Sequence, residues 1–548
     1  MSLSLESHCL SFREIPQTTK LFSAFLEEFD RVARYYAHPP TEAGLGAAAS
    51  EVGISPEVRR SVVEILREQN RRFSGDPTTE GNIDRLAAGA VAIVTGQQVG
   101  IFSGPAYSFY KAISAARCAQ EVTSRGIEAV PIFWLATEDH DIAEVNHSYW
   151  NTRSGLGRYE LPGREEDAGR RVGEVVFGEA IEPLVARASA SLEGGYAQIV
   201  ERALRESYGP SETYGSAFGK LMARLLAGRG IIFIDPLDRR LHQLAAPIYR
   251  RALEEADSLR EALLARSMEL DRSGFHAQVK VTRETTLVFY NLEGKRRPLR
   301  SRNEKFLAGK TLFSREALIS ALEKSPEDFT PNVLLRPIVQ DTLLPTAAYI
   351  GGTAEIAYTA QTQVVYEQLL GRMPVILPRA SFTIVEAPMA GLLLKYGLDI
   401  RDFFLGRQHL RGKMERKSLP SALRRRFERD EKIVRRLLAG YDEPFERLDR
   451  TLLGSLRLAE RKMLYQFAKL KAKAGRAEGL RTGVLDRHER ILVDSVYPHR
   501  GLQERSLCAL PFLAAYGLEL LDDLARRSSP YAAGEASSCG YRHQILVL

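Results

Sequence analysis

Apolar residues recur every three or four positions through much of the first eighty residues. This spacing predicts helices over residues 19–36 and 55–73, the second opened by Ser55 as a cap and by Pro56 in the first turn. The run GLGAAA, residues 44–49, matches a dinucleotide-binding pattern, but it follows no strand. We therefore expect a loop there.

Short runs of β-branched and aromatic residues predict a parallel sheet in the next part of the chain. Residues 90–97 form one such run, a helical pattern follows over 107–118, and residues 130–135 form a second run. A strand, a helix and a second strand in this order indicate parallel strands. The expected fold class is α/β with a Rossmann-like parallel-sheet core, whose ligands bind at the carboxyl ends of the strands.

Later strands of the same sheet are predicted far along the chain, within residues 229–238, 334–369 and 373–386. A polar, glycine-rich stretch with helices and a strand hairpin turning at Glu293 and Gly294 separate them, and we interpret both as insertions. The expected division is as follows: N-terminal helices and first part of the core, 1–147; first insertion, 148–228; core continuation, 229–270; second insertion, 271–330; core completion, 331–410; helical coiled-coil hairpin, 411–500; C-terminal helix and tail, 501–548.

A helical hairpin is predicted after Pro420, with its two helices joined near Gly440 and Pro444. The net charge of +7 is concentrated there, because residues 411–490 hold 23 Lys and Arg against 12 Asp and Glu. A solvated polar face explains this excess, and a polyanion or a phosphorylated ligand is the alternative. The apolar positions at helical spacing are Leu423, Phe427, Val434 and Leu437 in the first helix and Leu448, Leu452, Leu456, Ala459, Met463, Phe467 and Leu470 in the second.

The composition of the 548 residues, 44% hydrophobic and 26% charged, is that of an ordinary globular protein with several domains. The chain has no basic stretch followed by an apolar one at its start and no apolar run long enough to span a membrane. Its cysteines contain no CxxC pair, which argues against a disulfide framework and a thiolate zinc site. These features favour a cytoplasmic protein without a membrane partner. The four cysteines are Cys9, Cys118, Cys508 and Cys539.

The most informative local motif is TGQQVGIFSGPAYSFYK, residues 95–111. Its glycines, among them Gly104, open a helix directly after a strand, where backbone N–H groups and the helix dipole favour an anion. An ordinary tight turn is the alternative. Gln97 and Gln98 add amide donors and acceptors to the candidate binding site, whereas Lys111 is expected on the solvated surface of the helix.

Four ionisable residues, Glu138, Asp139, His140 and Asp141, follow the second predicted strand. Such groups must be solvated, paired or bound to a ligand, because burying each one without compensation costs several kcal/mol. We therefore expect them to be catalytic, with the carboxylates recognising a substrate ammonium or hydroxyl group and His140 able to carry a proton.

Asn146 and His147 lie close behind this cluster and join the candidate binding residues, with His147 as a second proton carrier. A zinc or manganese site built from His140, Asp141, Glu144 and His147 is the alternative. No strict metal-binding spacing is present, so we predict no metal site.

The motif GGTAEIAY contributes a third group of candidates. Gly351 and Gly352 allow a ligand to approach the backbone closely, and Glu355, Tyr358 and Gln361 share roughly one face of the following helix. A capping box at the start of this helix is the alternative explanation.

The motif PRASFTIVE places Arg379 and Ser381 after another strand, where they can bind a phosphate or a carboxylate. Arg336 and Asp235 are weaker candidates of the same kind, for which a structural role is the alternative.

Six separated segments together resemble one known family in the same order: VTGQQVGIFSGPAYSFYK, PIFWLATEDHDIAEVNH, GFHAQV, GGTAEIAYTAQ, LPRASFTIVE and GLQERSL. The chain resembles the bacillithiol biosynthesis cysteine-adding enzyme family, BshC, nearly from end to end. The resemblance implies a core related to class I nucleotidyltransferases, two connecting-peptide insertions and an α-helical coiled-coil domain through which the protein forms a homodimer.

The resemblance also implies the reaction of a ligase that adds cysteine to glucosaminyl-malate to form bacillithiol. Amide formation from a free carboxylate near neutral pH needs activation, so ATP with Mg²⁺ is the expected cofactor. A cysteinyl adenylate is the simple hypothesis, but the sequence has no HIGH-type or KMSKS-type tetrapeptide, so an acyl phosphate stays open. In this hypothesis the cluster from Glu138 to Asp141 orients the amine, and one member accepts its proton.

Two other functions remain as alternatives. A synthetase-like, nucleotide-dependent enzyme acting on RNA or another amine acceptor would use the basic helical region, although no anticodon-binding module is visible. A non-catalytic scaffold would work through the coiled coil. We expect the ligase, with small-molecule substrates and no nucleic-acid partner.

Overall fold

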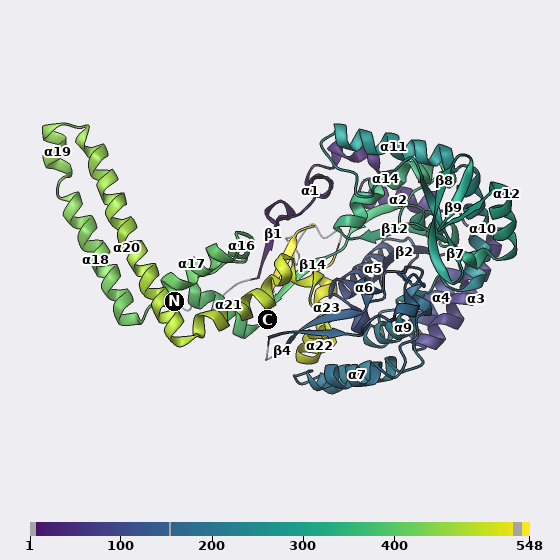
Figure 1. Cartoon of the computed structure of the whole chain (residues 1–548), viewed down its shortest axis with the longest axis horizontal. Helices are drawn as coiled ribbons and strands as arrows, with labels where there is room; N and C mark the ends of the chain where they lie inside the picture. Colours follow the sequence, from purple (N-terminus) through teal and green to yellow (C-terminus); the bar gives the residue numbers. More distant parts are fainter. Residues whose placement is uncertain (1–6, 153–154, 530–539) are drawn as a thin grey trace.

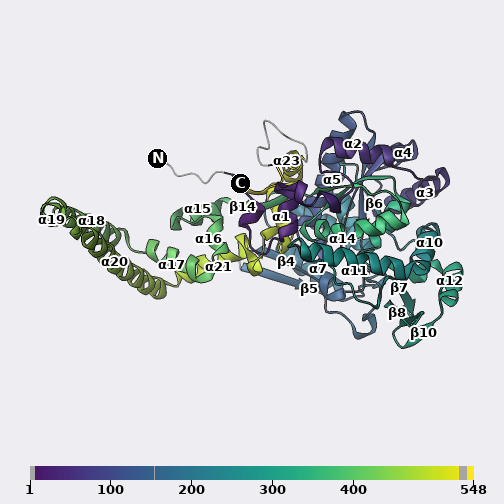
Figure 2. The same cartoon turned by 90° about the horizontal axis from the view of Figure 1, so that it is seen from above.

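The computed structural model describes residues 7–152, 155–529 and 540–548. It shows an α/β body from which a long helical hairpin projects, in both views (Figure 1 and Figure 2). Within the described part of the chain, no helix combines the length and the apolar character that crossing a membrane requires.

The body is built around a five-stranded parallel sheet. Its strands are, from one edge to the other, β13 (Val375–Pro378), β12 (Thr346–Gly351), β2 (Val91–Gln97), β3 (Ala129–Leu135) and β6 (Ile232–Ile234). Counted along the chain from the β6 edge, this order is 3-2-1-4-5, the order of a Rossmann-like sheet. The expected Rossmann-like core is therefore confirmed, and the order of strands reverses between β2 and β12.

Helices cover both faces of this sheet, so its strands are buried on both sides. Ala92 and Val94 of β2 face the apolar cluster of α3, α10 and α14, whereas Ile93 between them faces the cluster of α2 and α5. The bounds of these helices are α2 (Glu42–Glu51), α3 (Pro56–Phe73), α5 (Tyr107–Ser124), α10 (Arg239–Glu254) and α14 (Thr353–Leu369).

The alanine-rich run 44–49 lies within helix α2, so the expectation of a loop is wrong. Thr41 caps the helix by accepting a hydrogen bond from the backbone N–H of Gly44. A Cβ atom at Gly44 would lie 2.1 Å from the carbonyl oxygen of Pro39, so glycine permits this close approach. Three consecutive alanines, the strongest helix formers, continue the helix.

The expected N-terminal helices are only partly regular. The second is α3, where the Ser55 hydroxyl accepts the N–H of Val58 and Pro56 occupies the first turn, as predicted. The first shortens to α1 (Lys20–Glu27), followed by two short 3₁₀ turns. Helix α4 (Pro77–Ala87) then leads into β2.

Two segments lie between strands of the parallel sheet. The first contains the hairpin β4 (His147–Thr152) and β5 (Gly155–Glu160), which the sequence did not predict, and the expected helices α7 (Ile181–Ala190), α8 (Ala197–Ser207) and α9 (Tyr214–Leu225). After α11 (Ala256–Arg272), the second forms an antiparallel sheet of β7 (Thr285–Leu292), β8 (Lys295–Arg302), β9 (Lys305–Ala308), β10 (Thr311–Phe313) and β11 (Phe329–Pro331), together with α12 (Arg315–Lys324). Its turn between β7 and β8 uses positive φ angles at Glu293 and Gly294, which confirms the predicted hairpin.

A third sheet joins the two ends of the described chain. Strand β15 (His543–Val547) lies between β1 (His8–Leu10) and β14 (Ser381–Val385). Residues 543–547 of the expected tail therefore form a buried strand, whereas residues 530–539 of it lie outside the described residues. Cys118 and Cys508 are buried free thiols, whereas Cys9 in β1 is disulfide-bonded, which the scattered cysteines did not predict.

The predicted helical hairpin is confirmed by α18 (Ser421–Ala439) and α20 (Leu452–Thr482), joined through α19 (Asp442–Leu448). Phe427 and Phe467 meet across it with their ring centroids 6.4 Å apart. The remaining helices of this half of the chain are α15 (Ala387–Tyr396), α16 (Ile400–Phe404), α17 (Arg407–Lys417), α21 (Val484–Val496), α22 (Leu510–Tyr516) and α23 (Glu519–Arg526).

Part of the apolar stripe of the hairpin faces solvent. Leu437 is 60% exposed and Leu448 78%, and Met463 and Leu470 are also exposed. These side chains lie outside the contact between the two helices within one chain, so the hairpin retains an apolar surface.

Candidate active site

A cavity of about 1090 Å³ lies between the carboxyl edge of the parallel sheet and the antiparallel sheet. The ends of β2 and β3, the start of α14 and strands β7 and β8 form its walls. This is the point where the strand order reverses, which is the usual ligand site of an open α/β sheet. Nine of the main candidates from the sequence and the weaker candidate Arg336 line it; the nine are Gln97, Gln98, Glu138, Asp139, His140, Gly352, Glu355, Tyr358 and Arg379.

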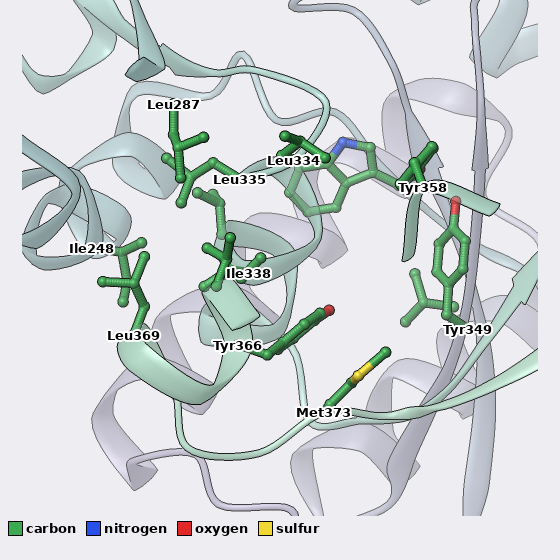
Figure 3. Close-up of a cluster of buried hydrophobic side chains, with 14 of the residues drawn as sticks. Ile248, Leu287, Leu334, Leu335, Ile338, Tyr349, Tyr358, Tyr366, Leu369 and Met373 are labelled. Atoms are coloured by element: carbon green, nitrogen blue, oxygen red, sulfur yellow. The ribbon is translucent and has the colours of Figure 1, made fainter. Parts of the chain in front are cut away.

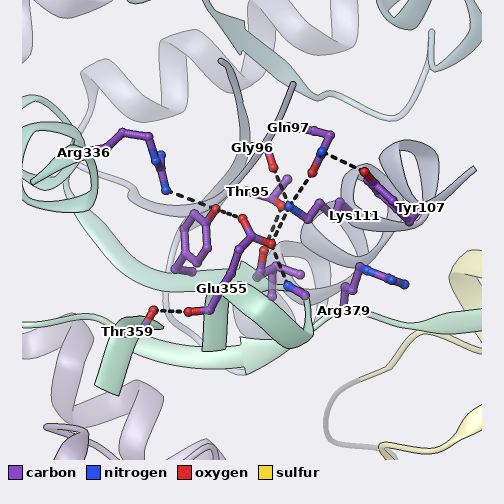
Figure 4. A network of polar contacts seen from close by, with 12 residues as sticks. Thr95, Gly96, Gln97, Tyr107, Lys111, Arg336, Glu355, Thr359 and Arg379 are labelled. Atoms are coloured by element: carbon purple, nitrogen blue, oxygen red, sulfur yellow. Dashed lines mark hydrogen bonds and ion pairs between the residues drawn. The ribbon is translucent and has the colours of Figure 1, made fainter. Parts of the chain in front are cut away.

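Lys111 lies at the centre of a polar network in this cavity (Figure 4). Its ammonium group donates to the carbonyl oxygen of Gly96 at 2.6 Å and to Gln97 Oε1 at 2.8 Å, and it lies 2.5 Å from Glu355 Oε2. Its three N–H groups therefore have three partners, so Lys111 positions Gln97 and Glu355 and offers no free charge to a ligand.

The expectation of a solvated Lys111 is wrong, because α5 is buried around this position. Only 3% of its side chain is exposed. Burial lowers the pKa of Lys111 to about 8, although the carboxylate of Glu355 opposes this shift.

Glu355 lies in the first turn of α14 and has two roles. Its Oε2 atom accepts the backbone N–H of Gly352 at 2.7 Å, as in the capping box considered from the sequence, and the same carboxylate pairs with Lys111. Its Oε1 atom accepts the hydroxyl of Tyr349 at 2.5 Å, and Arg336 donates to that hydroxyl at 3.2 Å. The structure therefore places Arg336, a weak candidate in the sequence, within the cavity wall.

The wall behind Tyr349 and Tyr358 is a hydrophobic cluster (Figure 3). Leu334, Leu335 and Ile338 belong to this cluster and are fully buried. Close packing of this kind limits the rotamers of the two tyrosines. Gln361, on the next turn of α14, exchanges hydrogen bonds of 2.8 and 2.9 Å with the backbone of Val279, and so holds the segment that carries Val279 against the cavity.

Arg379 reaches the cavity from the connection between β13 and β14. Its guanidinium group lies 2.7 Å from the buried carboxylate of Glu504. Glu504 also accepts the Ser381 hydroxyl at 2.8 Å, and Ser381 contacts His543 Nδ1 at 2.7 Å. Ser381 therefore lies behind the cavity and supports the position of Arg379 through Glu504.

Asp139 and His140 form a cluster with Gln98 and Arg296 at the cavity wall. Gln98 Nε2 donates to Asp139, the backbone N–H of His140 donates to Asp139 Oδ1 at 2.7 Å, and Arg296 donates to His140 Nδ1 at 3.0 Å. Burial by itself would raise the pKa of Asp139, but the hydrogen bonds with His140 and Gln98 and the charge of Arg296 hold it well below its usual value. Asp139 is therefore a fixed carboxylate at neutral pH.

Glu138 has a different environment. It is 7% exposed and lines the cavity, and burial raises its pKa to about 7, against the opposing charges of Arg296 and Arg171. Glu138 is therefore poised to gain or lose a proton near neutral pH, whereas its neighbour Asp139 is not.

Several predicted residues lie outside the large cavity. Asp141 caps the short helix α6 (Ile142–Val145) by accepting the N–H of Glu144, and it is exposed, so it is separated from the other three members of its cluster. Gly104 packs against Gly100, where a Cβ atom would lie 2.9 Å from the Gly104 Cα. This contact supports the alternative of a tight turn at that glycine.

Asn146, His147 and Gly351 also lie away from the large cavity. Asn146 Oδ1 contacts His147 Nδ1 at 3.2 Å, and His147 faces a second cavity of about 230 Å³ that shares Glu144 and Arg505 with the first. Gly351 ends β12, and its carbonyl accepts the backbone N–H of Arg379 at 2.9 Å.

The structure supports neither the alternative metal site nor a ligand-binding role for Asp235. Among the described residues, no three His, Cys, Asp or Glu side chains form a group suited to a metal ion, and this includes His140, Asp141, Glu144 and His147. Asp235 accepts the hydroxyl of Thr137 at 2.5 Å behind the cavity, which is the structural role considered for it.

The sequence missed several charged residues of the site. Arg283, Arg296 and Arg300 come from the antiparallel sheet and the segment before it, which carried no recognisable motif. Arg505 lies in the motif GLQERSL, which resembled the family but suggested no chemistry.

Comparison with known proteins identifies the family. The model described as "Bacillithiol biosynthesis BshC, N-terminal Rossmann-like domain" matches residues 5–380, and the model described as "Bacillithiol biosynthesis BshC, C-terminal coiled-coil domain" matches residues 382–534. The chain belongs to the BshC family. Its coiled-coil domain therefore contains the projecting hairpin, and its Rossmann-like domain contains most of the cavity wall.

Relatives within the BshC family cover almost the whole chain. A protein of Koribacter versatilis is 40% identical, one of Solibacter usitatus 38% and one of Chlorobaculum tepidum 31%, and each alignment covers 94% of this chain and 93% or more of the relative. Each of the three is named "Putative cysteine ligase BshC".

Proposed function

We propose that the protein is a ligase that joins the carboxyl group of cysteine to the amine of glucosaminyl-malate and so forms bacillithiol. Membership of the BshC family and the names of its relatives support the cysteine ligase activity. The volume of the cavity, about 1090 Å³, is large enough for two small substrates.

The observation that carries this proposal is the distribution of charge in the cavity. Asp139 is held as a carboxylate, which suits recognition of a substrate ammonium group. Arg283, Arg300 and Arg505 line the cavity with exposed side chains, and none of them forms an ion pair within the described residues. Free guanidinium groups bind carboxylates and phosphates in two-point contacts, so they suit the two carboxylates of malate and a nucleotide.

We further propose that the carboxyl group of cysteine is activated with ATP. An amide does not form from a free carboxylate near neutral pH without such activation, which ATP supplies when bound. The exposed arginines fit its phosphates, and Glu144 at the cavity wall is a carboxylate of the kind that holds Mg²⁺ together with phosphate oxygens.

We also infer that the protein acts as a homodimer through its helical hairpin. The exposed apolar side chains of α18, α19 and α20 support this inference, because soluble proteins normally bury such surfaces against a partner. Since cysteine and ATP are cytoplasmic metabolites, we place the reaction in the cytoplasm.

The ligase proposal is tested by mass spectrometry of the purified protein incubated with cysteine, glucosaminyl-malate, ATP and Mg²⁺, omitting each in turn. We expect the condensed product only in the complete mixture, with AMP or ADP showing which phosphate bond is broken. The variant Asp139→Asn should lose affinity for glucosaminyl-malate, whereas Asp141→Asn, outside the cavity, should not. Absence of product from folded protein under every condition would contradict the ligase, and product without ATP would contradict the activation.

A further inference from the structure

His242 is a buried histidine beside the cavity, on helix α10, that no sequence motif indicated. Its side chain is 2% exposed, and its Nδ1 atom lies 3.1 Å from the carbonyl oxygen of Phe329. Because a carbonyl oxygen only accepts hydrogen bonds, the ring proton is on Nδ1, and Nε2 carries a lone pair. Burial lowers the pKa of His242 to about 4, so the ring is neutral at neutral pH.

The Nε2 atom of His242 is buried and has no hydrogen-bond partner. The charged group next to it is the carboxylate of Glu138, whose Oε1 atom lies 3.7 Å away. A buried acceptor without a partner calls for an explanation, and a catalytic role is one of those known. Solvent does not reach Nε2, and Glu138 Oε1 at 3.7 Å lies just beyond hydrogen-bond distance, so a protonated Glu138 becomes its donor after a small shift of the side chains.

Glu138 itself is free to take up that proton. Within the described part of the chain, its carboxylate makes no hydrogen bond like those that fix Asp139, and its closest ionisable contact is His242. One side of Glu138 lines the cavity and the other faces His242. The residue therefore connects the substrate space with a buried acceptor.

We propose that Glu138 accepts the proton of the attacking amine and that His242 is the positioning residue that receives the hydrogen bond of the resulting carboxylic acid. The inference rests on the proposed ligase function. As the amine nitrogen forms its bond to the activated carbonyl carbon, the bond from that carbon to the phosphate oxygen breaks. The phosphate group leaves with the electron pair, and the amine proton moves to Glu138. Glu138 returns it to water when the product leaves.

The charged groups around this pair act in both directions. Arg296, Arg171 and Arg336 favour the ionised form of Glu138, whereas Asp235 favours the protonated form. On the side of His242, Arg171 opposes protonation of the ring, and Glu327 and Asp238 favour it. Tyr249 faces both residues: its ring stacks on that of His242 with the centroids 6.5 Å apart, and burial and the charge of Glu138 raise its pKa, so it stays a neutral phenol.

The first test needs no substrate. In infrared difference spectra of the full chain, wild type should show a carboxylic-acid carbonyl band that titrates near pH 7 and is absent in Glu138→Gln. In His242→Leu the acid loses its acceptor, so the midpoint should fall by about one pH unit, the equivalent of one hydrogen bond. In His242→Gln, whose amide oxygen can still accept a hydrogen bond, the midpoint should fall less. In the matched control His488→Leu on α21 the midpoint should not change.

The proposed hydrogen bond between Glu138 and His242 would be refuted by an unchanged or raised midpoint in a folded His242→Leu. It would also be refuted if the carboxylic-acid band persisted in Glu138→Gln. The second test measures ligation against pH. We expect Glu138→Gln to lose about 10²-fold or more in kcat while it still binds glucosaminyl-malate. His242→Leu should move the acidic limb of kcat/KM to lower pH. If the infrared titration behaves as expected but wild type forms no product, the pair stands and the ligase function fails.

Discussion

Replacing Lys111 by methionine isolates the buried ion pair at the centre of the site. Methionine keeps most of the length of the side chain and removes its charge. The carboxylate of Glu355 then remains buried, with 18% of its side chain exposed and with only the N–H of Gly352 and the hydroxyl of Tyr349 as donors. The variant therefore measures the effect of one unpaired charge.

Breaking one side of a buried ion pair costs about 3–5 kcal/mol, and the two remaining donors place this variant near the lower limit. The loss should depend on pH. In wild type, Lys111 is the main group that lowers the pKa of Glu355 against the effect of burial, so the pair is intact at pH 5 and largely intact at pH 7.5, just below the pKa of Lys111 of about 8. In Lys111→Met the pKa of Glu355 rises, so the folded state binds a proton as the pH falls. The difference from wild type should therefore be smaller at pH 5.

Guanidinium unfolding followed by tryptophan fluorescence measures this difference, because the protein has only two tryptophans and Trp134 lies in β3 beside the cavity. The double variant Lys111→Met/Glu355→Gln should recover part of the stability, and the exposed control Lys310→Met should lose none. A loss below about 1 kcal/mol at pH 7.5, or an equal loss at both pH values, would refute the reasoning.

Three further variants each test one local feature of the structure. Glu504→Gln breaks the buried pair with Arg379, and the free energy of unfolding should fall by about 3 kcal/mol in a denaturant titration; an unchanged midpoint would contradict this. Gly96→Ala would place a Cβ atom 2.8 Å from the carbonyl oxygen of Trp134. Calorimetry should therefore show a lower Tm, equivalent to a loss of about 1–3 kcal/mol in the free energy of unfolding. A Tm equal to that of wild type would argue against this close approach. Leu437→Glu on the exposed hairpin surface should shift a dimer to monomer in analytical ultracentrifugation without changing the Tm of the body; a persistent dimer would place the interface elsewhere.

The pattern of residues predicted the scaffold of the site well, because its strands are short buried runs with clear ends. The sequence of β2, α5 and β3 followed from such runs, and the cluster after β3 was placed at the correct edge of the sheet. Glu138 and Asp139 became distinct only in the structure, since their different partners come from β8, α10 and the turn after β2.

The residues that the sequence misplaced depend on contacts between distant segments. Lys111 looked like a surface residue because its partner Glu355 lies more than two hundred positions away. Arg296 and His242 carry no local motif. Arg296 reaches the cavity only when the antiparallel sheet packs over the core, and His242 comes to lie behind Glu138 only when α10 packs there. The prediction for Asp141 was wrong in the opposite direction. Its neighbours suggested a catalytic role, whereas its own side chain caps a helix.

If the protein is the proposed ligase, the cavity between the two sheets binds its substrates. A crystal structure of the protein with glucosaminyl-malate bound tests it most directly. We expect the malate carboxylates beside the exposed arginines and the amine beside Glu138 and Asp139. A ligand bound outside this cavity, for example on the helical hairpin, would contradict the account.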